Sequence, residues 1–338
     1  MSRRVQVLGY YGMANFGDDL FRQVVTQNAG KLWPGASVRT FAPMGLHRPY
    51  GDLGRIGSAT RLATGTLGAA WADTFALCGG SVLQSVSGVQ SLRRKLVGRR
   101  RFEALGVSVG PFDDPADGQE VLDFLSHFDR VIVRDTASAQ RLGGGVTVGG
   151  DLAALVGEVP RHNPDTARGL TICPSDASGT SAAEFTQQVL DGLGGRDIPV
   201  NVLALNHHHE LGDEGLSNEV AGGLREAGLG AVEVHSYRHL GVDGVIRFLA
   251  GSGVVWTQRL HGGIVSYLVG TPFVIVGHHA KCRDFASDIG LDPSLVLPTR
   301  GGDWSVASKT IEHPFGHWQL DPDEYMAKAR STYLKESV

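Results

Sequence analysis

The chain has 338 residues, of which 42% are hydrophobic and 20% charged, and its formal net charge is −4. This length suits two domains of roughly 150 residues each, and the mildly acidic charge argues against a nucleic-acid-binding protein. Its three cysteines are widely separated, which argues against a disulfide framework and against a zinc site. The sequence has neither an apolar run of about 18 residues nor a signal-peptide pattern, so we expect a cytoplasmic protein without a membrane span.

Short apolar, strand-like runs alternate with amphipathic stretches along the chain, which predicts βα units and parallel sheets. Strands are expected at 5–10, 37–41, 74–77, 105–109, 130–133, 146–148, 170–173, 199–205, 231–235, 254–257, 273–276 and 295–297. Helices are expected at 18–33, 58–71, 115–127, 138–142, 181–194, 214–227, 242–250, 261–269 and 282–289, and over a basic cluster near residue 95. The fold class is therefore α/β.

A polar stretch with two prolines interrupts this alternation near residue 160. We predict an N-terminal domain at 1–158, a linker at 159–168, a C-terminal domain at 169–320 and a C-terminal helix at 321–338. Two Rossmann-like parallel-sheet domains of this kind are expected to face each other across a cleft, with ligands beyond the carboxyl ends of the strands. Such an arrangement suits transfer from a donor bound by the second domain to an acceptor bound by the first.

The loop after the first strand is rich in polar side chains. Asn15, Asp18 and Asp19 lie between two glycine-punctuated turns and the next helix. We expect Asp18 to cap that helix, but two adjacent carboxylates and an asparagine exceed what a cap needs. Because the carboxylates disfavour an anionic ligand, a sugar hydroxyl or a proton to be removed fits this loop better.

Two further strands of the first half end in candidate binding residues. Gly79, Gly80 and Ser81 follow an apolar strand, and paired glycines either allow a ligand to approach the backbone or simply form a tight turn. Arg134 and Asp135 follow another. Arg134 either binds a carboxylate or phosphate with its bidentate fork or pairs with neighbouring carboxylates, and both interpretations stay open.

In the second half, Arg259 and His261 lie where a strand becomes a helix. The free N–H groups of a helix start attract anions, so a cation and an imidazole here indicate phosphate recognition with proton transfer. Lys281 follows the next strand and is a third candidate cation, unless it is simply solvated. The histidines at 207–209 alternate between faces of an extended segment, so we expect no metal site there.

Taken together, these segments resemble the polysaccharide pyruvyl transferase family. The matching pieces are Asn15-Phe16-Gly17-Asp18, Gly79-Gly80-Ser81, Val133-Arg134-Asp135 with Ser138 and Leu142, Asp151-Leu152-Ala153, and Arg259-Leu260-His261 followed by Gly270-Thr271-Pro272. They occur in the family's order over most of the chain. Two positions depart from the pattern: Cys78 stands for the first of three glycines, and His278-His279 precedes the lysine where an aromatic residue is common.

The resemblance implies a fold similar to two-domain GT-B glycosyltransferases and transfer of a pyruvyl group from phosphoenolpyruvate to sugar hydroxyls as a ketal. It implies phosphoenolpyruvate as co-substrate, with no other cofactor and no metal. For this reaction we expect His261 to be the proton donor or, alternatively, a phosphate ligand, Asp18 the base or orienting group, and Arg134 a cation for the donor. The implied substrate-binding residues are Arg259, Leu260, Asn15, Asp19, Gly79, Gly80, Ser81, Asp135 and Lys281.

The implied acceptor is a sugar or a lipid-linked oligosaccharide in surface or exopolysaccharide biosynthesis. The basic cluster consists of Arg93, Arg94, Lys95, Arg99, Arg100 and Arg101. It is either a solvated helix face or a peripheral contact to an anionic membrane. The competing hypotheses are a GT-B glycosyltransferase that uses a nucleotide sugar, and a non-catalytic carbohydrate-binding protein.

Overall fold

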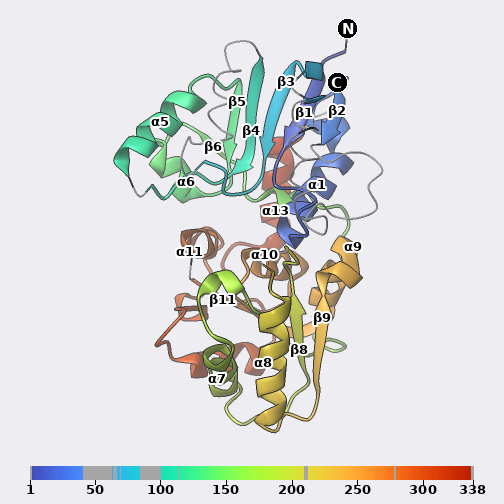
Figure 1. The fold of residues 1–338 in the computed structure, drawn as a ribbon, viewed down its shortest axis with the longest axis vertical. Helices are drawn as coiled ribbons and strands as arrows, with labels where there is room; N and C mark the ends of the chain where they lie inside the picture. Colours follow the sequence, from blue (N-terminus) through green and yellow to red (C-terminus); the bar gives the residue numbers. More distant parts are fainter. Residues whose placement is uncertain are drawn as a thin grey trace. The chain divides into compact units, whose positions relative to one another are not determined.

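Each half of the chain folds as a parallel β-sheet whose strands alternate with helices (Figure 1). The computed structural model describes residues 2–40, 63, 67–68, 70–83, 100–112, 114–208, 212–277 and 279–335. Unit 1 comprises Met1–Met13, Asp18–Gly157 and Tyr325–Val338, and unit 2 comprises Ala14–Gly17 and Glu158–Glu324. The segment expected as a linker is thus part of unit 2, and most of the C-terminal helix is part of unit 1.

Unit 1 contains a six-stranded sheet in the order β2-β1-β3-β4-β5-β6. Its strands are β1 (Arg4–Leu8), β2 (Ser37–Thr40), β3 (Thr74–Cys78), β4 (Arg101–Val107), β5 (Arg130–Val133) and β6 (Thr147–Val148). Its helices are α1 (Phe16–Gln27, from Asp18 on), α2 (Ala29–Leu32), α5 (Pro115–Leu125), α6 (Thr136–Arg141) and α13 (Pro322–Tyr333, from Tyr325 on). The strand order reverses between β1 and β3.

The core of unit 1 forms because its central strands are apolar on both faces. All five residues of β3 are buried, as expected for a parallel sheet covered on both sides. Phe102 of β4 packs its ring against Phe75, Phe124 and Phe128, with ring centroids 5.4, 6.4 and 5.2 Å away. These rings lie far from the strand tips, so they support the sheet and leave the tips to the polar loops.

Helix α13 joins unit 1 through two buried tyrosines. The Tyr333 hydroxyl donates to the carbonyl of Gly150 at 2.6 Å, and the Tyr325 hydroxyl accepts from the Asp151 N–H at 2.7 Å. The guanidinium of Arg130 donates to the Tyr333 carbonyl at 2.8 Å. The last helix therefore fixes the loop after β6, where Asp151 lies.

Unit 2 contains a second six-stranded sheet, in the order β12-β11-β10-β7-β8-β9. Its strands are β7 (Arg168–Cys173), β8 (Val200–Ala204), β9 (Val232–Ser236), β10 (Ser252–Thr257), β11 (Phe273–Val276) and β12 (Val296–Leu297). Its helices are α7 (Ala182–Leu193), α8 (Glu214–Glu226), α9 (Tyr237–Gly251), α10 (Leu260–Val269), α11 (Ala280–Asp288) and α12 (Lys309–Glu312). Here the strand order reverses between β7 and β10.

The predicted strands are all present, with ends displaced by up to four residues. Several helices start earlier than expected: α9 begins at Tyr237 instead of 242, across a non-helical Gly241, and α6 and α11 begin two residues early. Helix α1 begins at Phe16, and the Asn15 side chain accepts from the Gly17 N–H at 3.1 Å. The expectation that Asp18 caps this helix is therefore wrong, because Asn15 caps it and Asp18 lies in its first turn. Most of the helix expected at 58–71, and the basic cluster from Arg93 to Arg99, lie outside the described residues. Of the helices that are described, none is long and apolar enough to cross a membrane.

Candidate functional site

The strand order in unit 2 places two loops side by side at the carboxyl ends of β7 and β10. In open parallel sheets, ligands bind beyond the strand tips where the order reverses. Gln258, fully buried, joins these loops: its side chain accepts from the Ser175 N–H at 2.8 Å, and its backbone N–H donates to the Cys173 carbonyl at 2.9 Å. The loop after β7 is thus fixed next to the start of α10.

Arg259 is held at this point by Asp213, a residue that the sequence did not single out. The Nε of Arg259 donates to one carboxylate oxygen of Asp213 at 2.8 Å, and the Nη2 of Arg259 donates to the other. The Asp213 side chain is fully buried, whereas that of Arg259 is 18% exposed. Burial raises the pKa of Asp213, and Arg259 opposes this rise. Asp213 therefore fixes the orientation of the guanidinium at the edge of the site.

His261 lies in the first turn of α10, directly after Arg259 and Leu260. Helix α10 starts three residues after β10 ends, so its first backbone N–H groups lie at the strand tip, and the Arg259 side chain before it does not cap them. Leu260, proposed from the sequence as a substrate-binding residue, is buried. The helix start, Arg259 and His261 together form a place suited to an anion.

Further cations lie at the start of α11. The pKa of His279 is lowered, first by partial removal from water and then by Lys281, Arg259 and Arg283. Each of these cations is thus close enough to the His279 imidazole, which directly precedes α11, to disfavour its protonation. Lys281 lies in the first turn of α11, which follows β11, the strand next to β10 in the sheet. His278 and His209 lie outside the described residues.

A short segment from the N-terminal part of the chain, Ala14–Gly17, belongs to unit 2. The Phe16 N–H donates to the Leu205 carbonyl at 3.0 Å, and the His207 N–H donates to the Ala14 carbonyl at 2.8 Å. Asn15 forms an antiparallel bridge with Asn206. The segment is therefore paired with the backbone that follows β8.

The histidine segment after β8 has a structural explanation. The His207 side chain is buried between Ser236 and Glu214, with its Nε2 3.0 Å from the Ser236 hydroxyl and its Nδ1 3.3 Å from the Glu214 carboxylate. In the part of the chain that is described, no cluster of three potential metal-ligating side chains is found. His207 thus fixes the backbone to which the 14–17 segment binds.

In unit 1, the tips of β1 and β3 lie where the strand order reverses. The Tyr11 hydroxyl donates to the Cys78 carbonyl at 2.6 Å, and the Asp19 carboxylate accepts from the Gly12 N–H at 2.7 Å. A Cβ added at Gly80 would lie 3.9 Å from a carboxylate oxygen of Asp18. The structure thus brings Asp18 to Gly80, close to Ser81, while Asp19 fixes the loop.

Arg134 is buried among carboxylates. Its Nε lies 3.4 Å from Asp135, its Nη1 lies 3.6 Å from Asp151, and its Nη2 donates to the Ser108 hydroxyl. Asp135 also caps α6 by accepting from the Ser138 N–H at 2.7 Å. Burial raises the pKa of Asp151 to about 6, although Arg134 opposes the rise. Of the two interpretations of Arg134, the geometry favours pairing with carboxylates.

The model of one protein family, described as polysaccharide pyruvyl transferase, matches residues 15–280. The chain belongs to this family. The match begins at Asn15 and ends just before Lys281, so it includes the tips of both sheets and confirms the resemblance drawn from the sequence. A comparison with curated proteins finds no match to this chain.

Solved structures similar to this chain include proteins whose descriptions name UDP or a UDP-sugar. Staphylococcus aureus MnaA, solved with UDP, has a TM-score of 0.60 at 12% identity, covering 98% of this chain and 95% of its own. The putative UDP-N-acetylglucosamine 2-epimerase of Listeria monocytogenes has 0.55 at 10% identity, covering 98% and 92%. A trehalose-phosphate synthase of Burkholderia vietnamiensis has 0.53 at 13%, covering 98% and 95%. At such identities the likeness shows the fold, a GT-B-like α/β architecture.

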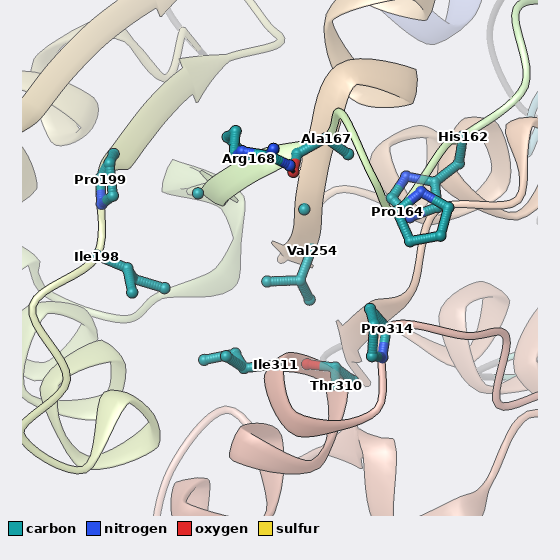
Figure 2. A pocket seen from close by; sticks show the side chains of 12 residues that line it. His162, Pro164, Ala167, Arg168, Ile198, Pro199, Val254, Thr310, Ile311 and Pro314 are labelled. Atoms are coloured by element: carbon teal, nitrogen blue, oxygen red, sulfur yellow. Dashed lines mark hydrogen bonds between the residues drawn. The ribbon is translucent and has the colours of Figure 1, made fainter.

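This protein also has a pocket at the amino-terminal ends of the unit 2 strands, opposite the strand tips that carry Arg259 (Figure 2). Its volume is about 390 Å³ and its lining is mostly apolar. Residues around it include Arg168, Ile198, Pro199, Val254, Ile311 and Pro314. His162 faces it as well, and partial burial lowers the pKa of that imidazole. The pocket lies at the strand starts, whereas the predicted site residues of unit 2 lie at the strand ends.

Proposed function

We propose that this protein transfers a pyruvyl group from phosphoenolpyruvate to sugar hydroxyls and forms a ketal, in the biosynthesis of a surface polysaccharide or exopolysaccharide. Membership of the pyruvyl transferase family supports the reaction class. The observation that carries the proposal is Arg259 at the tip of β10, whose guanidinium Asp213 orients beside the start of α10, with Lys281 in the first turn of α11 after the neighbouring strand. Phosphoenolpyruvate bears a phosphate and a carboxylate, and both require cationic or N–H partners.

In this proposal, Arg259, Lys281 and the start of α10 bind the donor. Asp213 engages two nitrogens of a guanidinium that has five N–H donors, so the fork is fixed in place with donors left to bind an anion. Arg134 is proposed to stabilise unit 1 through Asp135 and Asp151 and not to bind the donor. The donor is a co-substrate, and the proposal calls on no other cofactor and no metal.

The chemical steps follow from the donor. His261 gives a proton to the vinyl CH₂ carbon, which becomes a methyl group and leaves oxocarbenium character on the neighbouring carbon. A sugar hydroxyl adds to that carbon while Asp18 accepts or orients its proton. A second hydroxyl of the same sugar then displaces phosphate and closes the ketal. A positioned proton transfer of this kind contributes about 10²–10⁴-fold to the rate.

The acceptor is proposed to bind at the tips of β1 and β3 in unit 1. Asp18, Gly80 and Ser81 meet there, and carboxylate, hydroxyl and backbone groups suit sugar hydroxyls. The proposed acceptor is a sugar or a lipid-linked oligosaccharide at a cytoplasmic membrane face. Contact with that membrane through the basic cluster stays a prediction.

The test is phosphate release from phosphoenolpyruvate, measured with a panel of free and lipid-linked sugars. We expect release with one acceptor only, and a loss of about 10²–10⁴-fold in His261→Ala. His313→Ala is the matched control, because His313 is an exposed histidine of unit 2. Equal rates in the wild type and His261→Ala would contradict the assigned proton donor, and no release with any acceptor and no binding of phosphoenolpyruvate would contradict the reaction.

A second candidate is a glycosyltransferase that uses a nucleotide sugar. One observation favours it: the chain shares its fold with an enzyme solved with UDP. Thermal unfolding separates the two candidates, since a ligand at 100 times its dissociation constant stabilises the folded state by about 2.7 kcal/mol. Stabilisation by UDP or GDP but not by phosphoenolpyruvate would favour the glycosyltransferase.

A further inference from the structure

Gly17 is a glycine in an unexpected place. It is the second residue of α1, and its backbone is helical, without the positive φ that would demand glycine. In a helix, alanine is intrinsically preferred over glycine. Backbone conformation therefore does not explain why residue 17 lacks a side chain.

The imidazole of His261 does explain it. A Cβ added at Gly17 would overlap the Nδ1, Cε1 and Cγ atoms of that ring. The ring therefore packs directly on the Cα of Gly17, within unit 2. Any larger residue at this position would displace either the ring or the backbone.

The backbone at this position is not free to move away. Hydrogen bonds from Phe16 to the Leu205 carbonyl and from His207 to the Ala14 carbonyl fix the 14–17 segment on both sides. The Phe16 ring also packs edge-on against Tyr237, with centroids 5.7 Å apart. A side chain at residue 17 would therefore displace the imidazole rather than the segment.

We propose that Gly17 is a positioning residue: together with the backbone of the 14–17 segment it forms the surface that orients the His261 imidazole. The proposal rests on the proposed function, because His261 has a catalytic role only there. It explains why a segment of the N-terminal half belongs to unit 2, and why a residue with no side chain follows Phe16.

A double-mutant cycle tests the proposal through thermal unfolding and phosphate release. Gly17→Ala is expected to lower the unfolding temperature in the wild type but hardly at all in His261→Ala, because the second substitution removes the atoms that the new Cβ would meet. Gly17→Ala is also expected to lower kcat by at least about tenfold with a much smaller change in KM. The double variant is expected to be as active as His261→Ala alone. Gly222→Ala is the matched control, since a Cβ there meets nothing within 4 Å, and it is expected to change neither quantity adversely.

Equal destabilisation by Gly17→Ala in both backgrounds would overturn the proposal. A Gly17→Ala protein that unfolds earlier but keeps the wild-type kcat would also overturn it, since Gly17 would then have a purely structural role. Coupled stability with no phosphate release in any variant, the wild type included, would support the packing of His261 on Gly17 and contradict the proposed function instead.

Discussion

Removal of the Asp213 carboxylate is the most direct test of how the cationic site is built. Asp213 is fully buried and bonds two nitrogens of Arg259, so Asp213→Ala leaves a guanidinium without its partner. Breaking a fully buried ion pair costs about 3–5 kcal/mol. Because the Arg259 side chain is 18% exposed, water can replace part of the lost interaction, and we expect a loss of about 2–4 kcal/mol in the free energy of unfolding.

The assay is urea-induced unfolding followed by tryptophan fluorescence. Trp256 and Trp304 are buried in unit 2, so their emission reports on the unit that contains the substitution. The matched control is Asp323→Ala, which breaks a pair with Arg161 whose side chains are 71% and 45% exposed. A surface pair of this kind contributes at most about 1 kcal/mol.

The two outcomes differ clearly. A loss in Asp213→Ala several times that in Asp323→Ala, accompanied by weaker stabilisation by phosphoenolpyruvate, would support a buried carboxylate that orients Arg259. Equal losses in the two variants would refute the reasoning, because the pair would then contribute no more than a solvated one.

Two further predictions concern unit 1. Burial raises the pKa of Asp151 from 3.8 to about 6, so the folded state binds its proton more tightly than the unfolded state does. The free energy of unfolding should therefore fall as pH rises from about 4 to about 6. Asp151→Asn should flatten this dependence of the urea midpoint on pH, and an unchanged dependence would disprove the assignment. At Gly79, φ is 72° and a Cβ would lie 2.5 Å from the Phe21 ring, so Gly79→Ala should lower the free energy of unfolding by about 2–4 kcal/mol. Gly143→Ala, with φ of 76° and open space around it, should cost only the backbone part, about 1–2 kcal/mol; equal losses would exclude the collision with Phe21.

The strands were predictable because apolar runs of three to seven residues between turns have few alternatives in a βα chain. The run at Phe273–Val276 was placed at both ends, since a glycine and a proline bound it closely. The start of α1 could not be predicted, because Asn15 and Asp18 are both good capping residues. The sequence does not show which of their two side chains accepts a hydrogen bond from a backbone N–H. The backbone pairing of Asn15 with Asn206 decided it.

Site residues could be predicted where they stand together at one strand tip. They could not be predicted where they depend on a partner far away in the sequence. Arg259 and His261 stand together in the sequence, whereas Asp213 lies 46 residues away from Arg259 in a polar loop after β8. The one feature of the sequence that could have indicated Asp213 is its position after a predicted strand and directly before a predicted helix. Likewise, the choice between a ligand and an ion pair for Arg134 depended on Asp151, which only the order of the strands brings near.

The division of the chain has a consequence for how the protein is made. Most of α13 belongs to unit 1 but is translated after all of unit 2, so the tyrosines that close unit 1 are the last part of that unit to be added. A gene fragment for 158–324 would likewise lack Ala14–Gly17 and leave the backbone at Leu205 and His207 without its natural hydrogen-bond partners. We therefore expect fragments cut at 157/158 to be less stable than the same units in the whole chain, and exchanges of halves between relatives to need these short segments as well.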